Sequence, residues 1–369
     1  MTRFSGPKTF VAMVAFCLVA SLISWAQQPN QAPDGVVDSA TRSQVIDSIL
    51  KRLNDSYVFP DVAKKMEASI RERVSKNEYD QITSARSFSE TLTRDLQAIS
   101  KDKHLRVRYS HQPIPVREER REPTAEEREE ARRDYTWMNH GFNKVERLRG
   151  NIGYIEFSGF FNEEMGADTV ASTMNFLSGT DALIIDLRGN GGGNPRMVAL
   201  ICSYFFGSEP VHLNDLYWRE GNRTDEFWTR KEVAGKRYLD RDVYVLTSKR
   251  TFSGAEEFAY NLKNLKRATI VGETTGGGAH PGGMHRVHEH FGVFVPTGRA
   301  INPITKTNWE GTGVSPDVDV PASQALIVAR LMALKKTIVK LSNPDFKAGV
   351  QGEIDQLEKE LAELKAKKV

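Results

Sequence analysis

The sequence is poor in cysteine, with only Cys17 and Cys202 among its 369 residues. Two cysteines cannot form the network of disulfides that stabilises small secreted domains. Cys17 lies in an N-terminal segment that we expect to be removed. Cys202 lies in the apolar run from Met197 to Phe206, which favours a buried core thiol over a nucleophile. The sequence therefore predicts no disulfide framework and no cysteine chemistry.

An excess of charge of one sign is also missing. The chain has 51 Lys and Arg against 48 Asp and Glu, a formal net charge of +3. Nucleic-acid-binding domains usually carry a basic patch, and here no basic stripe interleaved with aromatic residues is present. We therefore expect no nucleic-acid partner. With 39% hydrophobic and 27% charged residues, the composition is typical of a globular chain with one large or two modest domains.

Long hydrophobic runs are confined to the N-terminus. Arg3 and Lys8 precede an apolar stretch from Phe10 to Ile23, and Ser24-Trp25-Ala26 has the small-x-small pattern of a cleavage site. The apolar stretch is short for a bilayer span. We expect a signal peptide over residues 1–26 and export to the periplasm or the extracellular space. Retention of the segment as a membrane anchor is the alternative.

The rest of the chain separates into a helical part and an alternating α/β part. Amphipathic patterns predict the helices, and apolar strand runs interleaved with helical patterns predict an α/β core. The charged run at 113–134 suggests a solvated helix or an insertion without chemistry. We expect the tail helix to be solvated, with pairing to a partner helix as the alternative. The expected parts are a linker at 27–40, a helical module at 41–103, a strand plus charged insertion at 104–149, a core at 150–342 and a charged helical tail at 343–369.

Ser253 stands where a predicted buried strand becomes a predicted helix. Residues Asp242 to Ser248 form a short apolar run, and Gly254 to Leu265 have helical periodicity. A serine in the first turn of that helix directs its hydroxyl outward, near the positive end of the helix dipole. Ser253 is therefore a candidate nucleophile, with a plain helix N-cap as the alternative.

A glycine-rich turn follows the apolar strand that ends at Leu187. Gly191, Gly192 and Gly193 leave backbone amides bare, and Pro195 suits the first position of the next helix. The turn lacks the lysine and serine of a P-loop and the spacing of a dinucleotide fingerprint. It is either a tight turn without function or, beside an exposed serine, an oxyanion hole.

A serine nucleophile requires a general base, and the chain has eight histidines. His104 lies at a predicted helix-to-strand junction and His280 in a glycine-rich loop, and local sequence does not separate the two. His285, His288 and His290 decorate a predicted strand, where the neighbouring carboxylate points to the opposite face. Because no histidine pair has metal-ligand spacing, we expect no metal and no cofactor.

Four motifs, in this order, resemble the tail-specific (C-terminal processing) serine protease family. They are DLRGNGGG from Asp186, TFSGAEEFAY from Thr251, RATIVGETTGGGAHPGG from Arg267 and NWEGTGVSPDVDV from Asn308. The resemblance covers residues 150–321 and is greatest to the branch with the tricorn protease core and interphotoreceptor retinoid-binding protein. The segments NDSYVFPDVAKKM and DKHLRV resemble the N-terminal module of that branch. The resemblance implies an α/β spiral core related to crotonase and Clp protease; no PDZ domain is evident.

The resemblance also implies roles for individual residues. Ser253 corresponds to the nucleophile, and the amides of Gly193 and Gly254, with Gly192 beside them, correspond to the oxyanion hole. Bacterial processing proteases use a lysine base, but Gly278 stands at its position in this chain.

In the tricorn-like branch a histidine is the base and an acidic residue supports it, which corresponds to His104 and Glu310 here. That branch has a serine directly before the histidine, whereas this chain has Lys103. A helix-junction cap for His104 and a surface salt bridge for Glu310 are the alternatives. His280, Gly277 and Asn190 are possible residues of a substrate cleft.

These observations predict an exported serine-type endopeptidase that cleaves polypeptides through an acyl-enzyme on Ser253 with a histidine base. One alternative is a catalytically silent module of the same fold that binds a lipophilic ligand or a peptide. Another is an esterase that uses the same residues. Because a pure binding module has no need of the serine, histidine, glutamate and glycine run together, their retention favours an enzyme. The oligomeric state is left open.

Overall fold

The computed structural model describes residues 33–116 and 124–366, so the expected signal peptide lies outside the described residues. Residues from Asp34 onward form one compact unit. Within the described ranges, no helix combines the length and the apolar character needed to cross a membrane.

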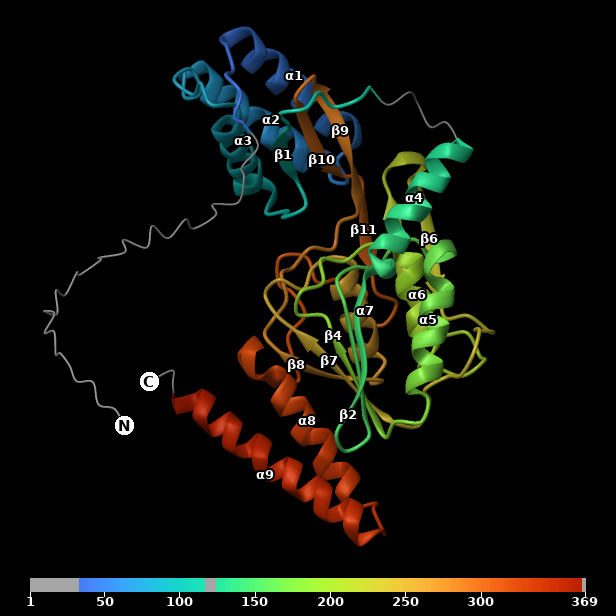
Figure 1. Ribbon diagram of the computed structural model, residues 1–369. Coiled ribbons are helices and arrows are strands. Elements are labelled where there is room, and N and C mark those ends of the chain that lie inside the picture. Colours follow the sequence, from blue (N-terminus) through green and yellow to red (C-terminus); the bar gives the residue numbers. More distant parts are fainter. Residues whose placement is uncertain (1–32, 117–123, 367–369) are drawn as a thin grey trace, which may run out of the picture. The chain divides into compact units, whose positions relative to one another are not determined.

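A six-stranded sheet forms the centre of the α/β core (Figure 1). Its inner pairs are parallel, and only the edge strand β2 runs antiparallel to its neighbour. Because parallel strands end at the same edge of a sheet, the loops after β4 and β7 meet there. In sheet order the strands are β12 (Val318–Asp319), β8 (Thr269–Gly272), β7 (Asp242–Thr247), β4 (Ala182–Asp186), β3 (Ile152–Phe157) and β2 (Phe142–Leu148).

Successive side chains of the central strands enter two separate apolar layers, as the alternation of a strand requires. Leu183 and Ile185 of β4 pack in the layer that contains residues of α5, α6 and α7, whereas Ile184 packs toward α8 and α9. Helices therefore cover both faces of the sheet, which confirms the predicted α/β core. These helices are α5 (Glu163–Leu177), α6 (Pro195–Ser203), α7 (Gly254–Asn264), α8 (Ala322–Ile338) and α9 (Pro344–Ala366).

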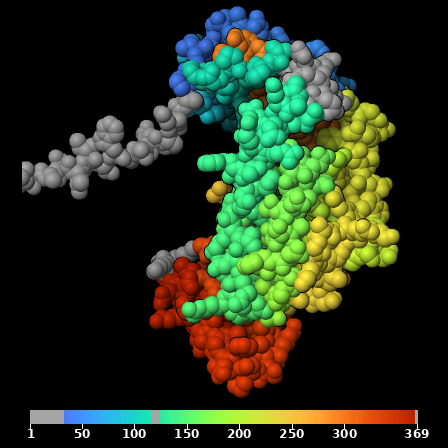
Figure 2. Space-filling view, turned by 45° about the vertical axis from the view of Figure 1, so that its right-hand side comes forward, coloured from blue at the N-terminus to red at the C-terminus, as the bar shows by residue number. Residues whose placement is uncertain are grey.

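The N-terminal helices share an apolar core with strands from much later in the chain. Strand β1 pairs with β10, and β10 pairs with β9, although both partners come from the range expected to belong to the protease core. In Figure 2 the orange of these later strands is accordingly surrounded by the blue of the N-terminal helices. The elements are α1 (Ser39–Ser56), α2 (Pro60–Ser75), α3 (Ala85–Ser100), β1 (Arg106–Tyr109), β9 (Gly282–His288) and β10 (Phe291–Pro296).

A second small sheet lies beside the core, and its strand β5 begins at His212. It has the order β11-β5-β6, and residues of β5 and β6 contact α6 and α7. Helix α4, within the charged insertion, buries no side chain, which agrees with the expected solvated helix. The remaining elements are α4 (Ala125–Trp137), η1 (Asn139–Gly141), β5 (His212–Trp218), η2 (Glu220–Asn222), β6 (Arg223–Trp228) and β11 (Gly298–Ile301).

Candidate active site

Ser253 lies immediately before the first residue of α7, at the end of the loop that follows β7. Its backbone has φ +55° and ψ −123°, a conformation that residues with a side chain rarely adopt. The Ser253 N–H donates to the Glu256 carboxylate at 2.8 Å, and the Phe252 N–H donates to the Asn190 carbonyl at 3.1 Å. Contacts to the glycine-rich loop and to the helix itself therefore hold a sharp, strained turn at the serine.

The glycine-rich loop packs directly against this turn. A methyl group on Gly192 would lie 2.6 Å from the Gly254 nitrogen and 2.8 Å from Ser253 Cβ. A methyl group on Gly193 would lie 2.0 Å from the Phe160 carbonyl oxygen, and both glycines have positive φ. Only residues without a side chain fit here. A methyl group on Gly254 would lie 3.0 Å from the Gly193 nitrogen. Gly193 and Gly254, whose amides are expected to form an oxyanion hole, are therefore neighbours.

The three residues expected to line a substrate cleft are buried. Asn190 is fully buried, donates to the Phe157 carbonyl and accepts from the Gly192 N–H, so its side chain fixes the loop from behind. Gly277 is buried and donates its N–H to Glu256. The buried His280 ring is hydrogen-bonded to the Asp102 carboxylate. All three residues are thus buried and hydrogen-bonded within the protein, and their place in a substrate cleft stays a prediction.

His104 lies between α3 and β1, and its ring reaches the residue before the serine. The imidazole contacts the ring of Phe252, with centroids 4.6 Å apart, and stacks on Phe294 at 5.8 Å. The His104 backbone N–H donates to Asp102 Oδ1 at 3.0 Å, which fixes the junction. No hydrogen bond joins His104 to Ser253 among the described residues. His104 is thus next to the serine turn, and of the two candidate histidines it is the one that contacts Phe252.

The His104 imidazole is held in its neutral form. Burial lowers the pKa of His104 to about 4, while the nearby Asp102 carboxylate acts in the opposite direction. His104 Nδ1 is buried and has no hydrogen-bond partner among the described residues. A neutral imidazole can accept a proton, which is the property required of a general base.

Glu310 contacts His280 rather than His104. Asp102 Oδ2 lies 2.8 Å from His280 Nδ1 and accepts a hydrogen bond from the Tyr57 hydroxyl at 3.2 Å. Glu310 Oε2 lies 3.5 Å from the same His280 nitrogen and accepts from the Ala279 N–H at 2.5 Å. This carboxylate network, defined as Asp102, His280 and Glu310, joins the α3–β1 junction to two loops of the core.

The carboxylate network has the composition of a metal site, since one ligand atom from each residue falls within 4.8 Å of the others. However, Asp102 Oδ2 and Glu310 Oε2 already accept hydrogen bonds from protein groups. Burial and the negative charge of Asp102 raise the pKa of Glu310 to about 7. The arrangement is a buried network in which protein donors hold two carboxylates beside one imidazole.

Glu256 is the main residue of the site that the sequence reasoning missed. Its fully buried carboxylate accepts hydrogen bonds from the Ser253 N–H, the Thr275 hydroxyl and the N–H groups of Gly277 and Gly278, at 2.5–2.8 Å. Burial raises its pKa, and these donors oppose the rise. The Ser-x-x-Glu spacing of a capping box was the available signal. Glu256 connects the serine turn to the loop that carries Gly278.

Gly278, where the resemblance led us to expect a lysine base in bacterial processing proteases, leaves room for the histidine. A methyl group there would lie 2.2 Å from Phe252 Cζ and 2.7 Å from His104 Cε1. Lys103 approaches the same loop from the other module, donating from Nζ to the Gly276 carbonyl at 2.5 Å. The absence of a side chain at position 278 is thus a condition for the observed position of His104.

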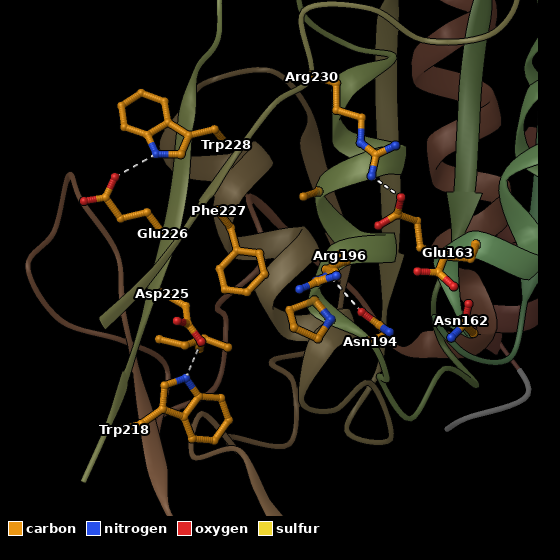
Figure 3. A pocket seen from close by; sticks show the side chains of 14 residues that line it. Asn162, Glu163, Asn194, Arg196, Trp218, Asp225, Glu226, Phe227, Trp228 and Arg230 are labelled. Atoms are coloured by element: carbon orange, nitrogen blue, oxygen red, sulfur yellow. Dashed lines mark hydrogen bonds and ion pairs between the residues drawn. The ribbon is translucent and has the colours of Figure 1, made fainter. Parts of the chain in front are cut away.

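A cavity of about 600 Å³ opens beside the glycine-rich loop (Figure 3). Its walls come from the N-terminal parts of α5 and α6 and from strands β5 and β6, so the small sheet forms one side. The lining residues are Asn162, Glu163, Glu164, Asn194, Pro195, Arg196, Ala199, Leu216, Trp218, Asp225, Glu226, Phe227, Trp228 and Arg230.

A strained serine, adjacent backbone amides and a neutral histidine form the kind of constellation that supports nucleophilic acyl transfer. Comparison with known families agrees with this class. Residues 151–320 match the model of Peptidase family S41, and residues 39–136 match the N-terminal domain of Peptidase S41 in eukaryotic IRBP. The chain therefore carries an S41 peptidase domain preceded by the N-terminal domain of the IRBP type, and the expected family is confirmed.

Curated relatives share the S41 region of the chain. The chloroplastic C-terminal processing peptidase of Tetradesmus obliquus is 27% identical over 176 residues, which are 46% of this chain and 35% of the relative. The carboxyl-terminal-processing protease of Picosynechococcus sp. is 26% identical over 193 residues, 51% of this chain and 44% of the relative. The chain thus matches less than half the length of either protein.

A solved structure shares the fold over most of the chain. A lipoprotein from Streptococcus agalactiae aligns with a TM-score of 0.54 at 16% identity, covering 80% of this chain and 96% of the lipoprotein. At this identity the similarity establishes the mixed α/β fold alone.

Proposed function

We propose that the protein is a serine-type endopeptidase with Ser253 as nucleophile and His104 as general base. The observation that carries the proposal is the strained Ser253 backbone, packed against Gly192 and next to the amides of Gly193 and Gly254. Strain of this kind costs about 1–3 kcal/mol and is retained where a function requires it.

In the proposed reaction, Ser253 Oγ attacks the carbonyl carbon of a peptide bond while the His104 imidazole accepts the hydroxyl proton. The Gly193 and Gly254 amides stabilise the oxyanion of the tetrahedral intermediate. When the C–N bond breaks, His104 returns the proton to the leaving amine and an acyl-enzyme remains. Water then attacks the ester with His104 again accepting a proton, which releases the acid and restores the serine.

The carboxylate network has a supporting role in this proposal. Asp102 raises the proton affinity of the buried His104, which favours the imidazolium during catalysis. Glu310 and His280 hold the Asp102 carboxylate and the adjoining loops in place. Glu310 therefore acts through Asp102 and His280, rather than by contact with the His104 ring.

The experiment that tests the proposal is labelling of the folded full-length chain with a fluorophosphonate probe. We expect Ser253 to be labelled, Ser253→Ala to lose the label entirely, and His104→Gln to label at least ~100-fold more slowly, the range of a lost general base. An unlabelled, folded wild type would leave the binding-module alternative standing. Turnover of peptides compared with simple esters separates a peptidase from an esterase.

We also propose that the protein is exported, on the basis of the signal-peptide pattern at residues 1–26. Expression of the full chain in a bacterial host, followed by N-terminal sequencing of the mature protein, tests this. A mature chain that begins at Gln27 supports export with cleavage; a chain that keeps Arg3 and Lys8 contradicts cleavage.

A further inference from the structure

Strand β6 is an edge strand of the small sheet, so one side of its backbone has no partner strand. The Thr229 N–H, directly after β6, donates to the Val211 carbonyl on the side of β5. The irregular pairing lies in β5, so the alternation along β6 is continuous. The backbone groups of Thr224, Glu226 and Trp228 therefore point away from β5. They have no hydrogen-bond partner in the parts of the chain that the structure describes.

The cavity in Figure 3 runs along this free edge. Phe227 points toward the start of α6, whereas Glu226 and Trp228 lie on the opposite face of β6, where Trp228 stacks on His212. All three nevertheless line the cavity, together with Asp225. A cavity that touches residues of both faces of one strand also touches the backbone edge between them. The outward N–H and carbonyl groups of β6 are therefore accessible from the cavity.

The same cavity begins where the proposed oxyanion loop ends. Gly192 and Gly193 pack on the serine turn, and the next two residues, Asn194 and Pro195, line the cavity. Two residues of extended chain span at most about 7 Å. A polypeptide whose scissile bond lies at the oxyanion amides therefore enters the cavity within a few residues of that bond.

We propose that the free edge of β6 binds the polypeptide substrate as an added strand, through backbone hydrogen bonds at Thr224, Glu226 and Trp228. An extended chain presents N–H and carbonyl groups at the spacing of a strand, and this pairing gives affinity from the main chain. The segment recognised is extended or unfolded, because the backbone groups of a folded segment are already paired. The inference rests on the proposed function of Ser253.

The opposite wall of the cavity favours a single chain over the sheet edge of a second protein copy. Arg230, two residues after β6, forms an ion pair with Glu163, the first residue of α5. This pair ties the end of the β6 segment to α5, and the start of α6 lies between them (Figure 3). Neighbouring strands lie about 4.8 Å apart, so one extended chain fits beside β6, whereas a second sheet requires the space that α5 occupies.

Hydrogen–deuterium exchange on the full-length Ser253→Ala protein tests the pairing without turnover. Casein, at saturating concentration, is the unfolded polypeptide used as probe. We expect the N–H groups of Thr224, Glu226 and Trp228 to exchange at least ~10-fold more slowly with casein, because pairing protects them, while the alternate amides stay unchanged. Unaltered exchange at the outward amides would overturn the inference. Protection without casein that grows with protein concentration would also overturn it, since two copies would then pair.

Glu226→Pro removes one outward N–H without removing a bond to β5, a change that edge strands tolerate. With Ser253 intact, we expect kcat/KM for casein to fall about three- to tenfold, the effect of one lost backbone hydrogen bond. Turnover of p-nitrophenyl acetate and fluorophosphonate labelling should keep the wild-type rate, because neither reagent reaches β6. Glu226→Ala keeps the N–H, so its loss with casein should stay below about twofold. If urea unfolding shows that Glu226→Pro does not fold, Thr224→Pro replaces it.

Two results with the proline variant contradict the inference: casein turnover at the wild-type rate, or an equal loss with casein and with the acetate ester. Fluorophosphonate labelling separates the inference from the proposed function. A labelled wild type whose outward β6 amides stay unprotected in the Ser253→Ala form contradicts the added strand alone. An unlabelled wild type whose Ser253→Ala form shows the alternating protection contradicts the nucleophile and supports the added strand.

Discussion

At the scale of single residues, the site depends on a serine in an unfavourable backbone conformation and on a histidine without a positive charge. The same burial that lowers the pKa of His104 to about 4 also reduces its strength as a base, and Asp102 offsets part of this loss. Neutral His104 is therefore present over a wider pH range than an ordinary histidine. This difference is measurable in the dependence of the reaction on pH.

Activity should persist to a lower pH than in enzymes whose catalytic histidine has the ordinary pKa of about 6.5. Only neutral His104 can accept the serine proton, so kcat/KM falls as the pH drops through the pKa of the free enzyme. We expect the acid limb near pH 4, with full activity retained between pH 5 and 6.5. An acid limb at pH 6.5 would contradict the buried, neutral state of His104.

Asp102→Asn provides a check on the cause of this pKa. Removal of the carboxylate removes the contribution that raises the proton affinity of His104. We expect the acid limb to move to lower pH and kcat to fall, while the fluorophosphonate still labels Ser253. A shift of the limb to higher pH would show that Asp102 does not act on His104 through its charge.

Gly278 is predicted to be essential for the position of the histidine. In Gly278→Ala, the added methyl group overlaps Phe252 and His104, so one of the two rings must move. Because a displacement of about 1 Å in a catalytic group can cost ~100-fold in rate, we expect kcat/KM to fall by that order. Gly179→Ala, whose methyl group meets no atom within 4 Å, is the matched control and should keep full activity.

At the scale of elements, the first turn of α7 connects the serine to the loop before β9. Glu256 accepts four hydrogen bonds, and two of them come from the backbone of Gly277 and Gly278. Because the one buried carboxylate accepts hydrogen bonds from both segments, it fixes the distance between the serine turn and Gly278, which leaves room for the His104 ring. The element thus positions both partners of the proposed proton transfer.

Glu256→Gln should damage catalysis more than the small change in shape suggests. The amide NH2 of the glutamine would face groups that are themselves hydrogen-bond donors. At least one buried backbone N–H therefore loses its acceptor, which costs about 1–3 kcal/mol. We expect slower fluorophosphonate labelling and a lower kcat with little change in KM, measured beside urea unfolding. Glu360→Gln is the control. If the Glu256→Gln protein were less stable but were labelled at the wild-type rate, the role of Glu256 would be structural only.

The sequence was sufficient to predict the local parts of this arrangement but not their contacts. The strand-to-helix corner at Ser253 and the glycine run after β4 have periodicity and turn signals that any chain with this fold must carry. The contact between Asp102 and His280 joins residues 178 positions apart, and no local pattern encodes it. A glutamate in the first turn of a helix is usually exposed to solvent, and only the tertiary structure reveals that Glu256 is buried.

At the scale of the whole molecule, the candidate site is assembled from two apolar cores. Asp102 and His104 follow α3, which packs in the core with β1, β9 and β10, whereas Ser253 precedes α7, which packs in the central α/β core. After His280 the chain leaves the central core, and the next strands, β9 and β10, pack with β1 and the N-terminal helices. This segment therefore connects His104 and Asp102 to the side of the site that carries Ser253.

The C-terminal tail belongs to the fold rather than to the solvent. One side of α9 buries Val350, Ile354 and Leu357 in the apolar layer that also contains α8. Leu357 is only 2% exposed, so Leu357→Ala should lower the free energy of unfolding by about 2–5 kcal/mol in urea denaturation. Phe346→Ala, at a side chain that is 66% exposed, is the control and should change it by less than about 0.5 kcal/mol. If Leu357→Ala instead left stability unchanged and altered only the association state, the apolar side of α9 would serve a partner helix.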